Sequence, residues 1–194
     1  MRREFPMTAE EFVQHRDDLP EGGRWHELHS GRPVLLTEPD DQHGTIVLNL
    51  SRAIAEWLAA HRGQRSGYAC HEVGLHVGRS PDTVYVPAIS FFDSGPLFGQ
   101  TDNIIATEVP RLVVDVASSN DRRRDMRDRT QAYFSLGVDM IWIPDPFKKE
   151  VQVLQRKSQT LALGTWQFLE GSAVLPGFRM EVRQVFAQPK WWTT

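Results

Sequence analysis

The chain has 194 residues, of which 40% are hydrophobic and 24% are charged, and this balance suits one compact domain with a sizeable core. The formal net charge of −3 excludes a protein that binds nucleic acid through an overall positive field, so any basic binding surface must be local. Cys70 is the single cysteine, which excludes an intramolecular disulfide, and no apolar run spans a bilayer or forms a signal-peptide core, so we expect a cytoplasmic protein without a membrane segment.

The first part of the chain predicts a short helix, a hairpin and a long amphipathic helix. Thr8 to Glu11 form a capping box, and the helix that it starts should run to about Asp18. Residues 25–38 are typical of two short strands around a turn at Ser30-Gly31. Asp40-Asp41 can cap the next helix. Its apolar residues recur every three or four positions and are Ile46, Val47, Leu50, Ile54, Trp57 and Leu58.

The remainder predicts a mixed sheet. Residues 66–77 alternate loosely between apolar and polar side chains, and residues 83–92 are rich in β-branched and aromatic side chains, so both segments indicate strands. Residues 112–117 and 140–143 are typical of strands buried on both faces. A helix from about 121 to 136 should bury Met126, Thr130, Tyr133 and Phe134. Antiparallel hairpins are expected at 150–156, 161–163, 166–170 and 178–182.

These elements indicate an α/β (α+β) fold in which helices flank a mixed central sheet, with additional antiparallel hairpins. No repeat, linker or low-complexity segment divides the chain, so we expect a single domain over residues 1–194.

Charged groups gather at the end of one predicted strand. Asp115 lies in an apolar run, where a carboxylate is costly unless it is paired or binds a metal. The segment 121–129 that follows holds five arginines and three aspartates. Arg129 borders the buried stripe of the predicted helix, whereas Arg123 should be solvated. We therefore expect Asp115 and Arg129 to converge at one edge of the sheet, where a metal ion and a phosphate could be held.

The order and spacing of several short motifs resemble the family of putative restriction endonucleases within the PD-(D/E)XK nuclease superfamily. The resemblance extends from about residue 8 to residue 186 and implies a restriction-endonuclease-like fold. The matching motifs are Thr8-Ala9-Glu10-Glu11-Phe12, Glu27-Leu28, His43-Gly44, Val113-Val114-Asp115-Val116, Arg124-Asp125, Tyr133 with Gly137-Val138, Trp142, Asp145-Pro146 and Leu175-Pro176-Gly177-Phe178.

The chemistry that this resemblance implies is hydrolysis of a DNA phosphodiester bond with the help of Mg²⁺ or Mn²⁺. Such a metal takes oxygen ligands, usually from one or two carboxylates, and it lowers the pKa of a bound water while neutralising the phosphate. By resemblance, Asp115 and Glu27 are the candidate metal ligands. Together with Arg129 and His43, they are the candidate catalytic residues.

Four positions depart from the family pattern. Pro87-Ala88 stands where the family has Pro-Asp, and Asp115 stands where it has glutamate. Arg129 replaces the helical lysine; it can grip a phosphate but cannot act as a base. Arg32-Pro33 replaces a glutamate after the glycine turn. Because the loss of one preorganised partner costs roughly a hundredfold in rate, we expect hydrolysis to be weak or lost.

Each candidate residue also has a structural interpretation. Asp115 could form a salt bridge to Arg129 or Arg127, and Glu27 could be structural. His43 could cap its helix or donate a hydrogen bond to Glu27, an interpretation that we weigh above metal binding. The arginine-rich helix is more typical of a solvated face than of a surface that contacts DNA phosphates, because its charges are mixed.

Two hypotheses follow. The first is an endonuclease-like protein with a degenerate active site and DNA as its partner. The second is a non-catalytic binding or assembly protein on the same scaffold, which could act as a homodimer. Trp191 and Trp192 are expected to dock on the core or on a second subunit, because they would otherwise form an apolar patch.

Overall fold

The computed structural model of the chain describes residues 6–61, 67–94 and 103–188. Within these ranges the long helices are α2 (Asp41–Ala60) and α3 (Asn120–Leu136). The short helices are α1 (Ala9–Gln14) and α4 (Val182–Val185), and two 3₁₀ turns cover Arg16–Asp18 and Pro20–Gly23. No helix in this described part is both long and apolar enough to cross a bilayer.

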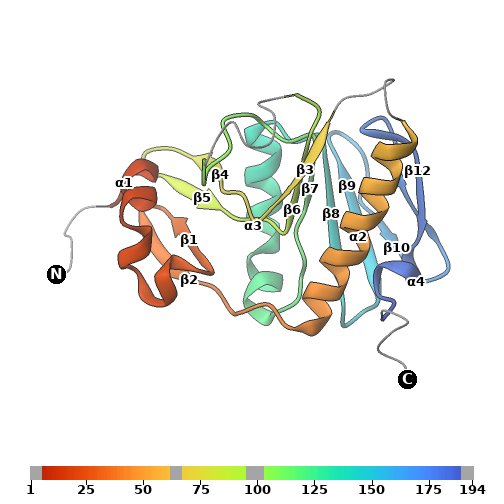
Figure 1. Cartoon of the computed structure of the whole chain (residues 1–194), viewed down its shortest axis with the longest axis horizontal. Coiled ribbons are helices and arrows are strands. Elements are labelled where there is room, and N and C mark those ends of the chain that lie inside the picture. Colours follow the sequence, from red (N-terminus) through yellow and green to blue (C-terminus); the bar gives the residue numbers. More distant parts are fainter. Residues whose placement is uncertain (1–5, 62–66, 95–102, 189–194) are drawn as a thin grey trace.

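The strands form three sheets (Figure 1). The largest has the order β10-β9-β8-β7-β6-β3, and its only parallel pair among these strands is β7 with β8. Its strands are β3 (Tyr68–His71), β6 (Ile89–Phe92), β7 (Leu112–Val114), β8 (Met140–Asp145), β9 (Glu150–Gln155) and β10 (Leu161–Leu163). A smaller sheet has the order β2-β1-β5-β4, with β1 (His26–His29), β2 (Arg32–Leu35), β4 (Leu75–Gly78) and β5 (Thr83–Tyr85). The third pairs β11 (Phe168–Gly171) with β12 (Leu175–Glu181).

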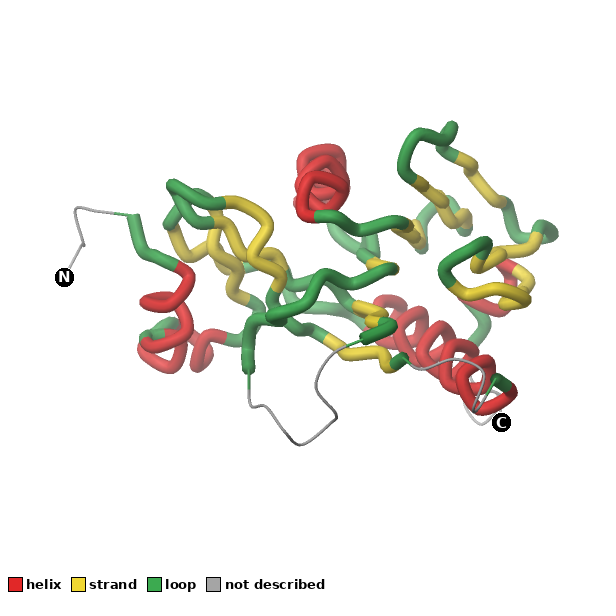
Figure 2. Tube along the Cα trace, turned by 90° about the horizontal axis from the view of Figure 1, so that it is seen from above, coloured by secondary structure: helices red, strands yellow, loops and turns green. Residues whose placement is uncertain are grey.

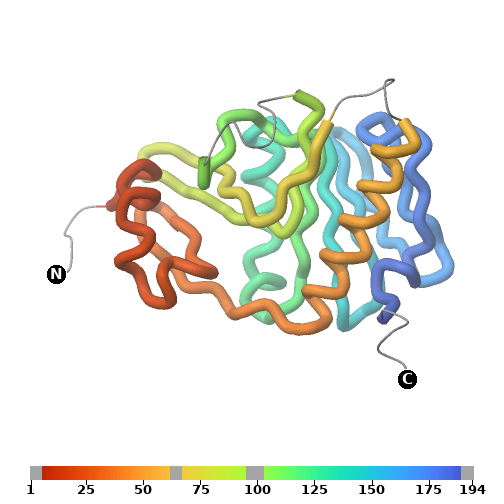
Figure 3. Tube along the Cα trace, in the orientation of Figure 1, coloured from red at the N-terminus to blue at the C-terminus, as the bar shows by residue number. Residues whose placement is uncertain are grey.

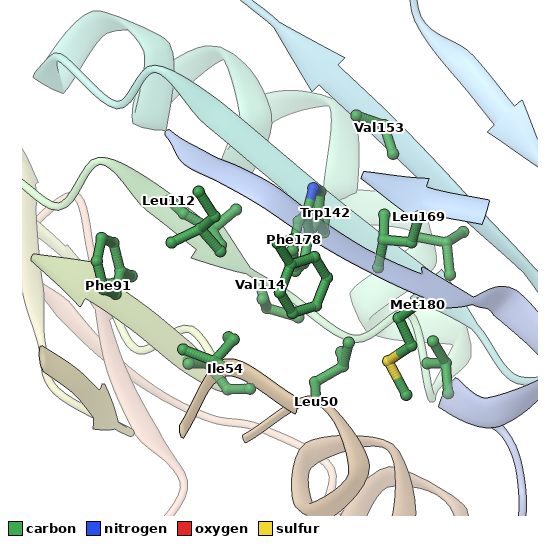
Figure 4. Packing of buried hydrophobic residues seen from close by; sticks show 14 of the residues in the cluster. Leu50, Ile54, Phe91, Leu112, Val114, Trp142, Val153, Leu169, Phe178 and Met180 are labelled. Atoms are coloured by element: carbon green, nitrogen blue, oxygen red, sulfur yellow. The ribbon is translucent and has the colours of Figure 1, made fainter. Parts of the chain in front are cut away.

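The two long helices cover opposite faces of the large sheet (Figure 2). Because side chains alternate along a strand, Leu112 and Val114 face the core under α2, and Val113 between them faces α3. The same alternation places Trp142 of β8 on the α2 side. The α2-side core also takes residues from α2, β6 and the β11–β12 hairpin (Figure 4).

The small sheet carries a core of its own at the N-terminal end of the molecule (Figure 3). Leu28 of β1 and Val84 of β5 pack there with Ala9 and Phe12 of α1. The C-terminal hairpin lies at the opposite end of the molecule (Figure 3). The small sheet meets the rest of the molecule where β4 packs against α3, and the charged centre lies at this junction.

Most of the predicted elements are confirmed. The capping box of Thr8 and Glu11 is present, and Asp40 caps α2 through the amide of His43. The expected helix to Asp18 is wrong in its length, because α1 ends at Gln14 and a 3₁₀ turn follows. The expected docking of Trp191 and Trp192 lies outside the described residues.

Candidate functional site

The candidate site begins at the end of β7, where the strand leaves the apolar core. The amide of Asp115 donates to the carbonyl of Trp142 at 3.0 Å, so the residue continues the pairing with β8. Strand alternation points its side chain to the same side as Val113, toward α3. The carboxylate is completely buried. An ionised group in this position requires compensating donors from its surroundings.

Arg129 supplies most of that compensation. Its Nε donates to Asp115 Oδ2 at 2.6 Å, as the sequence predicted when it placed the two residues at one sheet edge. Its two Nη groups donate to the two carboxylate oxygens of Glu27 at 2.6 and 2.9 Å, which is the bidentate geometry that a guanidinium favours. The Tyr133 hydroxyl donates to Asp115 Oδ2 at 2.8 Å. Burial disfavours the cation, but the charges of Asp115 and Glu27 outweigh it and raise the pKa of Arg129 well above its usual value.

Glu27 reaches this centre from β1 of the small sheet and is also fully buried. Besides the two bonds from Arg129, Oε1 accepts from the amide of Val86 at 2.7 Å, and His29 Nε2 lies 2.9 Å from Oε2. Burial alone would raise the pKa of this carboxyl, but Arg129 and these hydrogen bonds outweigh burial and lower the pKa to about 2. Glu27 is therefore ionised and its two oxygens are occupied by protein donors.

Arg122 is a member of the centre that sequence reasoning missed. It lies seven residues before Arg129 on the same face of α3, and its Nη1 is 3.4 Å from Asp115 Oδ1. Its side chain is only 8% exposed. The spacing of Arg122, Arg129 and Tyr133 (i, i+7, i+11) was the available signal, but the mixed charges around it indicated a solvated face. Of the two alternative partners considered for Asp115, Arg129 forms the salt bridge and Arg127 does not within the described structure.

The prediction that Arg123 is solvated is wrong. Its side chain is 25% exposed, its guanidinium stacks 3.9 Å from the centre of the Phe147 ring, and its Nε lies 3.6 Å from Asp145 Oδ2. The neighbouring arginines Arg122 and Arg123 thus point to opposite flanks of α3. Arg122 serves the charged centre, and Arg123 faces the β8–β9 hairpin.

His43 lies beside the centre but does not contact Glu27, so the alternative in which it donates a hydrogen bond to Glu27 is wrong. Its Nδ1 is 2.9 Å from Ser118 Oγ, and its backbone amide takes part in the cap of α2. Burial, followed by the positive charge of Arg122, lowers the pKa of His43 to about 4, so the ring is neutral at physiological pH. His29, which the sequence did not single out, makes the contact with Glu27 instead.

Ala88 occupies the position where the resemblance expects a metal-binding aspartate. It is buried and borders a cavity of about 30 Å³ whose lining includes His43, Glu72 and Arg122. The cavity has room for about one water-sized group. Glu72 is the one carboxylate among its lining residues, and it shares that lining with the Arg122 cation.

The residues present do not fit a magnesium ion. Mg²⁺ needs carboxylate oxygens with free lone pairs in a near-octahedral arrangement. Both oxygens of Glu27 and Oδ2 of Asp115 already accept short hydrogen bonds, Oδ1 faces Arg122, and Ala88 has no ligand atom. In the described ranges no three His, Cys, Asp or Glu side chains are grouped so that they could hold a metal ion.

Residues 9–183 match the Uma2 family, which is described as "Putative restriction endonuclease". The chain belongs to this family. Its fold is similar to the crystal structure of a putative nuclease of the DUF820 group from Anabaena variabilis, with a TM-score of 0.73 at 19% sequence identity. The match covers 93% of this chain and 98% of that one. A comparison of the sequence with curated proteins found no match. The nuclease-like fold expected from the sequence is therefore confirmed.

Proposed function

We propose that this member of the family is a non-catalytic binding protein that keeps the nuclease fold as a scaffold. The observation that carries the proposal is the charged centre itself. Two buried carboxylates face two buried arginines, so the cluster is balanced in charge without any bound ion. The partner that we propose is nucleic acid, because the family is described as "Putative restriction endonuclease".

The position of Arg129 supports this proposal physically. A group that clamps phosphate must turn at least part of its guanidinium toward the incoming ligand. Arg129 is 2% exposed, and each of its three nitrogens donates to a carboxylate oxygen within the protein. The centre therefore acts as a structural joint between α3 and the small sheet, and opening it to a phosphate would leave buried charges without partners.

A second candidate function, metal-dependent hydrolysis of DNA, is favoured by one observation. Glu72 lies at the cavity beside Ala88 and could supply the acid that position 88 lacks. The opposing fact is that Arg122 lines the same cavity and carries the positive charge that a metal ion would otherwise bring.

The test is titration calorimetry with Mn²⁺ and Mg²⁺, together with a plasmid-nicking assay, on the wild type and Glu72→Gln. We expect no saturable metal binding and no nicking by the wild type. The exposed position of Glu72 makes its variant suitable, because folding should survive the change. Metal binding and nicking that are both lost in Glu72→Gln would overturn the proposal and establish hydrolysis.

The converse variant carries Ala88→Asp, Asp115→Glu and Arg129→Lys, which supply the acids and the lysine of the family pattern. Metal binding gained by this variant would support the view that the three replacements removed a metal site. A folded variant that neither binds metal nor nicks the plasmid would count against the assignment of these positions.

A further inference from the structure

A groove lies on the flank of α3 that faces away from the charged centre. It has a volume of about 340 Å³ and is formed between α3 and the β8–β9 hairpin. Arg123, Met126 and Arg127 line it from the helix, and Lys148 and Leu154 line it from the hairpin. This volume is at the lower end of the range for small-molecule sites and suits a ligand about the size of one nucleotide.

The charges along the groove favour an anion. Arg123 and Arg127 are four residues apart, so they lie on the same face of α3. Arg127 is exposed and forms no ion pair with the described residues, and Lys148 has only a solvent-exposed contact with Glu150 at 3.5 Å, which is worth little. Nη2 of Arg123 is buried and has no hydrogen-bond partner in the described structure. Asp145 is the single carboxylate among the lining residues.

An aromatic side chain, Phe147, lies next to two residues that line this groove, Arg123 and Lys148. Phe147 is 70% exposed, and one face of its ring is covered by the guanidinium of Arg123. Asp145 Oδ1 accepts from the amides of Phe147 and Lys148 at 2.9 and 3.2 Å, which holds the turn that presents both side chains. An exposed ring beside cationic side chains is the combination that binds unpaired bases by stacking and their phosphates by charge.

We propose that this groove binds a nucleotide with an unpaired base, either free or as one unit of a single strand. The phosphate contacts Arg127 and Lys148, and the cation of Arg123 adds to the positive charge of the groove. The base stacks on Phe147, whose ring is preorganised by Arg123 behind it. The proposal rests on the proposed function only in its choice of nucleic acid, because the groove shares no side chain with the centre around Asp115.

The experiment measures binding of a fluorescent single-stranded thymidine oligonucleotide by anisotropy, in EDTA so that no metal-dependent step intervenes. Competition with free thymidine monophosphate, inorganic phosphate and a duplex of the same length distinguishes the sources of the ligand. We expect Phe147→Ala and Arg127→Ala each to weaken binding roughly tenfold. Arg127→Ala should also make the slope of log K against log salt concentration less steep by about 0.7, the value expected for the loss of one phosphate contact on a single strand.

Arg124→Ala is the matched control, because Arg124 is an arginine of the same helix that is 70% exposed and pairs with Asp121 and Asp125 away from the groove. Binding that Arg127→Ala weakens and Arg124→Ala leaves unchanged supports the site. The proposal would be overturned if both variants lost binding equally, or if neither the oligonucleotide nor the monophosphate bound. Binding of the duplex that does not depend on Phe147 would also overturn it. Because these outcomes do not involve a metal, they are independent of the calorimetric test of the charged centre.

Discussion

At the scale of single residues, Arg129 is the side chain that bridges the two buried carboxylates of the centre. Its guanidinium joins Asp115 of the large sheet to Glu27 of the small one, and it lies 4.4 Å from the centre of the Tyr85 ring. A planar fork with five donors can bridge two carboxylates at once, whereas a lysine ammonium cannot match the bidentate geometry. An arginine rather than a lysine at this position therefore suits the structural joint that we observe.

Arg129→Met should destabilise the protein by about 3–5 kcal/mol, because it leaves two buried carboxylates without their main partner. Arg129→Lys should cost less, since one ion pair can survive. Urea unfolding monitored by tryptophan fluorescence measures both changes, with Arg124→Met as an exposed control.

A triple variant with Glu27→Gln, Asp115→Asn and Arg129→Met tests whether the loss in Arg129→Met comes from the unpaired carboxylates. Removing these three charges together should recover part of the stability lost in Arg129→Met, since only the buried cation of Arg122 then lacks its carboxylate partner. Our account of the joint would be wrong if Arg129→Met alone lay within about 1 kcal/mol of the wild type.

At the scale of elements, α3 is the part that organises both sites. One flank carries Arg122, Arg129 and Tyr133 toward the charged centre, and the other carries Arg123 and Arg127 toward the groove. The position of the helix N-terminus therefore affects both sites, since the first arginines lie within its first two turns.

Ser119 caps this helix by accepting from the amide of Arg122 at 3.2 Å. Ser119→Ala should lower the free energy of unfolding by about 1 kcal/mol, because an amide of the first turn loses its acceptor. Ser135→Ala, an exposed serine near the other end of α3, should be neutral or slightly stabilising, since alanine is the better helix former. Chemical denaturation of the two variants measures the difference, and equal effects would argue against the cap.

At the scale of the whole molecule, two sheets with separate cores are joined by a buried charged cluster, so stability should depend on pH. The unfolded chain protonates histidine near 6.5, whereas folded His43 stays neutral until about pH 4. The unfolded chain protonates glutamate near 4.5, whereas folded Glu27 stays ionised until about pH 2. In both windows the unfolded state binds more protons, so stability falls as the pH falls.

We therefore expect the free energy of unfolding to decrease between pH 6.5 and pH 2, by on the order of 1–3 kcal/mol for each of the two groups. His43→Asn should flatten the upper part of the profile, and Glu27→Gln should flatten the part below about 4.5. Urea midpoints measured at half-unit steps of pH test this, with the exposed Glu10→Gln as a control. A profile that is level from pH 6.5 to 3 would refute the linkage.

Local patterns in the sequence alone were sufficient to predict much of the architecture. Some features depend only on neighbours within one turn or one strand, so they can be predicted before the fold is known. They are the alternation in β7, the three- and four-residue spacing in α2, and the caps at Thr8 and Asp40. They also predicted that Asp115 and Arg129 would meet, because a strand end and the helix that follows it share one edge of the sheet.

Only the tertiary structure decided how that centre is completed. The second partner of Arg129 is Glu27, which is 102 residues away in another sheet, and Arg122 rather than Arg123 turns inward. Neither fact follows from local spacing, because the helix face that is buried depends on what the rest of the chain packs against it. For the same reason, the groove beside Arg127 becomes visible only once the β8–β9 hairpin is placed next to α3.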